Sequence, residues 1–203
     1  MLKKTLLAVI LIAAMSVALS SVAMAQISDI YQLAYFANRN NASGFDQVVN
    51  IVNPGAQGSP MSSSEGLVCA NIYVFAPDQQ MIACCACPIT ADGLLSLSVN
   101  KNLTGNPLTG VAPNAGAIAL VSSAPEESLC DPTAISIDNV EPDLRAWSTH
   151  LVQTTPGTLF TIETGFLKAP LGQDELSSSF LPSTCRFTEY LGSGKGVCSC
   201  GLI

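Results

Sequence analysis

Eight cysteines constrain the folding of this chain more than any other feature. The full set is Cys69, Cys84, Cys85, Cys87, Cys130, Cys185, Cys198 and Cys200. An even number of cysteines in a chain with an export signal is typical of a disulfide framework. Sequence alone does not choose among the roughly 100 alternative pairings of eight cysteines. We therefore expect a disulfide-stabilised domain in an oxidising compartment.

The export signal occupies residues 1–25. Lys3 and Lys4 precede an apolar run at 6–14, and Ala-Met-Ala at 23–25 forms a cleavage site before Gln26. An uncleaved anchor is the alternative, but the apolar run is shorter than the roughly 20 residues that a spanning helix needs. The short basic stretch and the cleavage site resemble bacterial signals. We predict a secreted, periplasmic or cell-surface protein with no transmembrane segment after cleavage.

Short β-prone runs follow the signal, and proline and glycine separate most of them. Alternating apolar and polar residues, as in 94–99, indicate half-buried strands. We expect strands at 46–52, 67–75, 81–87, 94–99, 116–122, 144–153, 158–167, 180–191 and 196–203. This pattern predicts an all-β fold, an antiparallel β-sandwich or jelly roll, with no helix after the signal.

The predicted domain spans residues 40–203 and is single. Ahead of it, residues 26–39 fit a helical face and a strand face equally well, and this segment is a candidate N-terminal extended arm. The proline at position 88 is expected to end its strand. The connection at 124–143 is long for a compact domain and is a candidate for a functional loop.

Strand alternation leads to a hypothesis about the disulfides. Successive strand residues point to opposite faces, so Cys85 and Cys87 share one face and Cys84 takes the other. Two further cysteines share a face on the terminal strand 196–203. We hypothesise that this terminal pair bonds two members of the first group. The third member would bond Cys69 or a cysteine from the loops.

Two other readings of the cysteines remain open. Cys84 and Cys87 form a CxxC pair, but redox pairs of this kind act from a helix N-terminus, and Cys85 interrupts the motif. Alternatively, thiolates could bind a soft metal. The candidate ligands for such a site are Cys84, Cys85, Cys87, Cys198 and Cys200. Export to an oxidising space favours structural disulfides over both.

The stretch CANIYVFAPDQQMIACCACPIT, from Cys69 to Thr90, is followed by GLLSLSV. This combination resembles a motif of uncharacterised exported bacterial proteins that share a CCxC-containing β-hairpin. The resemblance covers about a sixth of the chain. It implies secretion and a common cysteine framework, and it assigns no activity or functional residue.

Acidity excludes one class of partner and suggests another. The net charge is −7, and no basic run is present after the signal, so nucleic-acid binding is not expected. Carboxylates gather in the long connection, where a flexible loop could offer oxygen ligands to calcium. The candidate calcium ligands are Glu126, Glu127, Asp131, Asp138, Glu141 and Asp143. Their spacing matches no EF-hand, and a solvated acidic loop is the competing interpretation.

No catalytic constellation is evident, so we predict a non-catalytic protein with a structural or adhesive role. One version is a fibre subunit that self-assembles when the arm at 26–39 adds a strand to a neighbour's sheet. The second class is a calcium-, soft-metal- or ligand-binding secreted module, and calcium is the one cofactor that we consider. The third is a hydrolase that uses His150, the only histidine, or two loop carboxylates.

Overall fold

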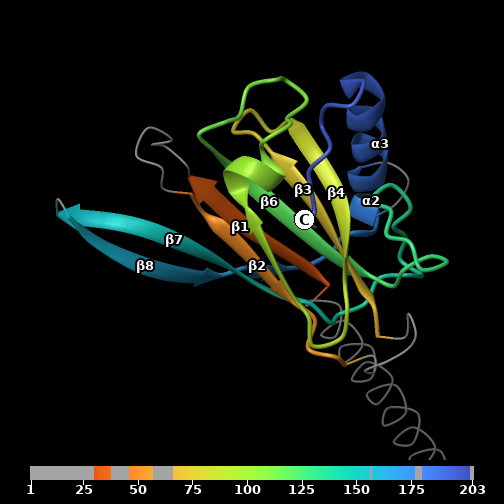
Figure 1. Ribbon diagram of the computed structural model, residues 1–203. Coiled ribbons are helices and arrows are strands. Elements are labelled where there is room, and N and C mark those ends of the chain that lie inside the picture. Colours follow the sequence, from red (N-terminus) through yellow and green to blue (C-terminus); the bar gives the residue numbers. More distant parts are fainter. Residues whose placement is uncertain (1–29, 38–45, 57–65, 156, 177–179, 202–203) are drawn as a thin grey trace, which may run out of the picture.

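The computed structural model contains two antiparallel sheets that pack face to face (Figure 1). It describes residues 30–37, 46–56, 66–155, 157–176 and 180–201. The all-β, disulfide-stabilised prediction is confirmed, because strands dominate and four disulfides link them. The strands are β1 (Tyr31–Ala37), β2 (Val48–Val52), β3 (Val68–Phe75), β4 (Met81–Ile89), β5 (Leu94–Ser98), β6 (Ala115–Ser123), β7 (Arg145–Thr155), β8 (Thr158–Gly165) and β9 (Leu167–Ala169).

Sheet A has the order β4-β3-β6-β1-β9, and sheet B has the order β5-β2-β7-β8. The chain crosses between the two sheets several times. Two of these crossings join edge strands, namely β4 to β5, and β8 to β9 through the buried Phe166. At each side of the sandwich, the edge strand of sheet A and the edge strand of sheet B are therefore consecutive in the chain: β4 and β5 on one side, β8 and β9 on the other.

The main core fills the space between the two sheets. Phe36, Ile72 and Leu120 of sheet A meet Ile51 and Leu97 of sheet B, and all five are buried. Successive residues of a strand point to opposite faces of its sheet, so every second residue of these strands points into this layer. Burial of these large apolar side chains is the main driving force for closing the sandwich.

A second core covers part of the outer face of sheet A. Tyr73, Ala119 and Val121 point outwards there and are buried beneath the helices and the long connection 124–143. The Tyr73 hydroxyl donates a hydrogen bond of 2.7 Å to the Pro132 carbonyl oxygen, and burial raises its pKa, so the phenol keeps its proton. The long connection thus contributes to packing.

The C-terminal region contradicts two expectations. The predicted strand at 180–191 is the helix α3 (Leu181–Gly192), which follows the short helix α2 (Gln173–Leu176). Leu181, Cys185 and Thr188 are buried at helical spacing, and a proline occupies the first turn. Within the expected strand at 196–203, residues 196–201 form no regular strand and pair with β4 through an isolated bridge at Val197, and residues 202–203 lie outside the described part of the chain.

Three smaller differences concern single segments. Residues 31–37 of the expected arm form β1, which pairs with β6 on one side and β9 on the other. Pro88 does not end β4, because β4 is the last strand of its sheet and a proline is tolerated at an edge. Val99–Leu103 form a single π-helical turn, η3.

Among the described residues, no helix has the length and apolar character needed to cross a bilayer.

Candidate functional site

The eight cysteines form four disulfides, and none is free. The pairs are Cys69–Cys130, Cys84–Cys185, Cys85–Cys198 and Cys87–Cys200. The terminal pair meets two members of the 84–87 group, which is the arrangement that we hypothesised from strand alternation. The third member, Cys84, bonds Cys185 of helix α3, so the expectation that it would bond Cys69 or a loop cysteine is wrong. The two sulfur-rich clusters consist of bonded cysteines with at most one carboxylate, so no thiolate remains there for a metal or for redox chemistry.

One long edge of the sandwich, which we name the closed edge, consists of β4 and the C-terminal residues 196–200. The Cys84 amide donates to the Gly196 carbonyl oxygen at 3.0 Å, and the Cys198 amide donates back to the Cys84 carbonyl oxygen at 3.1 Å. The disulfides Cys85–Cys198 and Cys87–Cys200 add two covalent links between the same two segments. The Ser199 amide also donates to Asn102 of η3, which links the edge to sheet B.

The six candidate calcium ligands do not form a cluster in the described part of the chain. No group of three metal-ligand side chains includes any of them. The Asp131 carboxylate instead accepts hydrogen bonds from the backbone and hydroxyl of Thr133. Burial, and then the charge of Asp143, raises the pKa of Glu141, and the remaining three, Glu126, Glu127 and Asp138, are exposed. Calcium binding stays a prediction.

His150 lies on β7, opposite Ile162 of β8, and is half-buried. Partial burial lowers its pKa, so the neutral imidazole is favoured. Trp147 points to the other face of the strand, because the two residues differ by an odd number of positions. The cross-strand neighbour of His150, Ile162, is apolar and supplies neither a nucleophile nor an orienting carboxylate.

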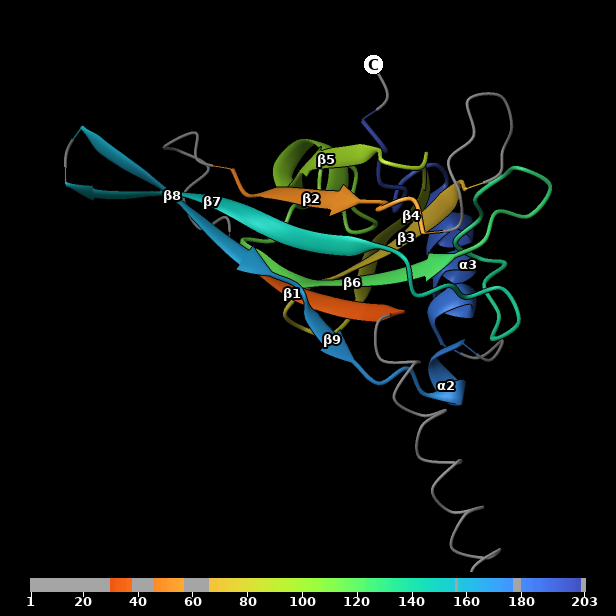
Figure 2. The ribbon, with the colours of Figure 1, turned by 90° about the horizontal axis from the view of Figure 1, so that it is seen from below.

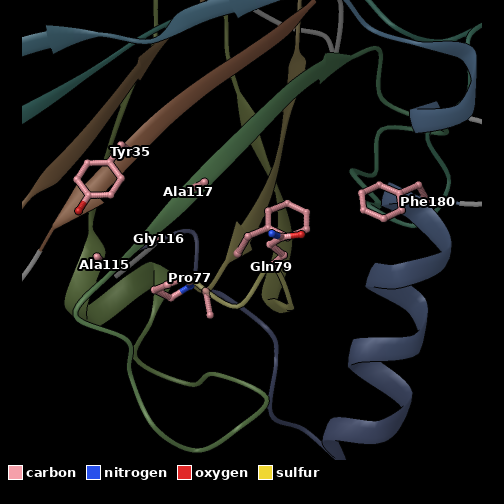
Figure 3. A pocket seen from close by; sticks show the side chains of 9 residues that line it. Tyr35, Pro77, Gln79, Ala115, Gly116, Ala117 and Phe180 are labelled. Carbon is pink, nitrogen blue, oxygen red and sulfur yellow. The ribbon is translucent and has the colours of Figure 1, made fainter.

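An apolar groove lies on the uncovered part of the outer face of sheet A (Figure 3). Its volume is about 510 Å³. The sheet register explains its shape: Tyr35 of β1 and Phe75 of β3 both pair with Ala117 of β6. A small residue therefore lies between two aromatic ones, across two strand spacings of about 10 Å in total. Ala115 extends the floor along β6.

Helix α3 supplies one wall of the groove. The Phe180 ring, at the start of that helix, is parallel to the Phe75 ring, with centroids 6.4 Å apart. The Cys84–Cys185 disulfide ties the helix to β4 and so fixes the distance between this wall and the sheet. Pro77 and Gln79 from the β3–β4 hairpin close the end of the groove (Figure 3). Its lining is almost entirely apolar, which suits contact with an apolar group.

The second unusual surface is the β7–β8 hairpin, which projects beyond the body of the sandwich (Figures 1 and 2). Every residue of β8 is exposed. Three of them are large and apolar, namely Leu159, Phe160 and Ile162, with about half of each side chain accessible. Within the described residues β8 pairs with β7 alone, so its outer side has unpaired amide and carbonyl groups. We name β8 the open edge.

No protein-family model, curated protein or solved structure matches this chain. The groove and the open edge are therefore the two surfaces that bear on function. Neither was predicted from the sequence. The groove depends on which strands are neighbours, and an exposed strand has the same apolar alternation as a half-buried one. The only available signal was the TLFTIET run, which lacks the lysine or proline that usually protects an edge.

Proposed function

We propose that this protein is a non-catalytic structural or adhesive protein that works outside the cytoplasm by surface contact through its β7–β8 hairpin. The observation that carries the proposal is the open edge itself, eight consecutive exposed residues with three large apolar side chains. Monomeric proteins usually protect such strands, because unpaired backbone groups next to apolar side chains recruit another chain. Four disulfides support the location, since they persist in oxidising compartments.

We place the contact at β8 and not at the N-terminal arm. Residues 31–37 already pair with β6, and 31–33 also pair with β9 on the other side, so donating them to a neighbour would require breaking two ladders. Strand β8 needs no such rearrangement. Deleting residues 26–39 would therefore remove a central strand and unfold the protein, whereas altering β8 would leave the fold intact and remove the contact.

The test compares secreted mature protein with the variant Leu159→Ser/Phe160→Ser. We expect the wild type to sediment with envelope material or as assemblies, and the variant to remain in solution as a folded monomer. The matched control is Leu94→Ser/Val111→Ser, which removes two apolar side chains elsewhere on the surface that are more exposed than Leu159 and Phe160. Equal release of both variants, or no association of the wild type with anything, would contradict the proposal.

The groove favours a second candidate function, the binding of a flat apolar ring. The aromatic side chains of Tyr35 and Phe75 on either side of Ala117 leave a slot suited to one aromatic group. The neutral probe N-phenyl-1-naphthylamine should gain fluorescence with the wild type. Tyr35→Ala should abolish the gain, and Tyr190→Ala, which removes a more exposed tyrosine on α3, should not. An unchanged gain in Tyr35→Ala would exclude the groove as the binding site.

A further inference from the structure

The four strand edges of this sandwich differ sharply in how they are protected. The closed edge at β4 is paired with residues 196–198, and the edges at β5 and β9 are only five and three residues long. The open edge at β8 has eight residues and projects away from the rest of the molecule (Figure 2). Natural proteins keep a long apolar edge unprotected when another strand is to be added there.

We propose that β8 pairs antiparallel with β8 of a second copy, about a two-fold axis at Thr161. This inference rests on the proposed function, because it names the partner of the hairpin. Pairing would join sheet B of two molecules into one continuous sheet in which β8 is followed by its symmetry mate. The interface is isologous, so it closes at two subunits and needs no second type of surface.

The internal symmetry of TLFTIET, residues 158–164, favours a second copy as the partner. The two residues next to Thr161, Phe160 and Ile162, are both large and apolar, and a threonine stands at each end of the run. An antiparallel pair centred on Thr161 places Phe160 of each copy opposite Ile162 of the other. Pairs of an aromatic and a β-branched residue are among the favourable cross-strand neighbours.

Charge selects the same register. Glu163 is the only charged residue of β8. With Thr161 on the axis it lies opposite Leu159 of the second copy, and the two Glu163 residues are four positions apart along the strand, about 14 Å. That distance exceeds the screening length of about 8–10 Å in physiological salt. A shift of the axis to Ile162 halves the distance, and a further shift places the two carboxylates face to face.

Cross-linking tests the register. Residues directly opposite in an antiparallel pair have Cα atoms about 4.5–5.5 Å apart, within the range that a disulfide spans. Thr161→Cys should therefore form a covalent dimer under mild oxidation of the otherwise fully bonded mature protein. Glu163→Cys alone should not, but it should cross-link to Leu159→Cys when the two variants are mixed. Cross-linking of Ile162→Cys in place of Thr161→Cys would overturn the proposed axis.

Sedimentation velocity, over roughly 1 to 100 µM of the mature protein, tests the dimer without oxidation. Ile162→Lys places a charge beside the axis and should weaken dimerisation at least about tenfold. Leu94→Lys, the same change on β5, should leave it unchanged. A monomeric wild type over this whole range would overturn the inference. If the Leu159→Ser/Phe160→Ser variant still lost its association with envelope material, the proposed function would stand without self-pairing.

Discussion

The closed edge at β4 and the open edge at β8 show two treatments of the same problem in one molecule. Both are long outer strands with apolar side chains. At β4, the C-terminal segment hydrogen-bonds both backbone groups of Cys84, the Leu108 amide donates to the Ile82 carbonyl oxygen, and two disulfides hold the C-terminal segment in place. At β8, within the described residues, no covering segment, bridge or proline is present, and all eight residues are exposed.

This contrast teaches that edge protection here is selective. The chain devotes four of its eight cysteines to the closed edge, at the cost of ordering its C-terminal end. A general need to avoid association would apply equally to β8. In the proposed function the unprotected strand is the place of contact, and variants at the two edges should therefore behave differently.

The largest expected effect follows from releasing the closed edge. Cys85→Ala/Cys198→Ala removes one bridge, and the other still holds the segment, so the expected loss of unfolding free energy is about 2 kcal/mol. Removing both bridges should cost about 5 kcal/mol, because the segment then detaches from β4. The loss is measured by denaturant unfolding of secreted protein.

A matched control removes Cys69–Cys130, which ties the long connection to β3 and leaves the closed edge covered. We expect a loss of about 4 kcal/mol without new association. The variant that lacks both edge bridges should instead acquire a second mode of self-association through β4. Identical assembly behaviour of the two variants would mean that the C-terminal segment does not protect that edge.

The sequence could predict the strands but not their neighbours. Seven of the predicted runs overlap observed strands, because local alternation and turn residues carry that information. Helix α3 was missed because Phe187, Tyr190 and Leu191 are apolar but exposed, which hides the helical spacing of the buried positions. Strand alternation could predict that the terminal cysteines bond two members of the 84–87 group, but it did not choose which two.

The two contact surfaces could not be predicted, for a physical reason. The groove requires Tyr35, Ala117 and Phe75 to be in register, and these residues are far apart in the sequence. Whether a strand such as β8 is covered depends on what packs over it, which a pattern of alternating residues does not encode. The acidic loop shows the converse, since a conspicuous cluster in sequence is dispersed in the structure.

The next effect compares two phenylalanines. Phe36 is fully buried between the sheets, and about half of Phe160 at the open edge is exposed. Phe36→Ala should cost about 3–5 kcal/mol of unfolding free energy, because it leaves a cavity in the main core. Phe160→Ala should change the stability of the monomer by about 0.5 kcal/mol or less. Chemical denaturation at low protein concentration measures both, and a comparable loss in the two variants would mean that the hairpin is packed in solution.

A smaller effect compares two glycines. A methyl group at Gly116 of β6 would overlap the Phe75 carbonyl oxygen and lie 2.7 Å from the Phe36 ring. Gly116→Ala should therefore cost about 1–3 kcal/mol through overpacking. At Gly165, the end of β8, the methyl group would meet no described atom within 4 Å. Gly165→Ala should be neutral or stabilise the protein by about 0.4–1 kcal/mol in thermal unfolding, by restricting the unfolded chain.

The smallest effect concerns His150, which lies opposite Ile162 of the open edge. Burial lowers its pKa from the ordinary value of 6.5, so the unfolded state takes up a proton before the folded state does. Stability is therefore fully present above pH 6.5, declines as the pH falls below 6.5, and levels off once the pH is below the folded-state pKa. The raised pKa values of Glu141 and Glu189 act in the opposite direction as the pH falls towards 4.5.

Comparing the wild type with His150→Gln isolates the histidine from these carboxylates, because both proteins contain them. Between pH 7.5 and 5.5, the melting temperature of the wild type should fall further than that of the variant. Pairing of β8 with a second copy would bury the imidazole more deeply, so the difference should increase with protein concentration. A difference that is present but independent of concentration would confirm the burial of His150 in the monomer and count against the paired edge.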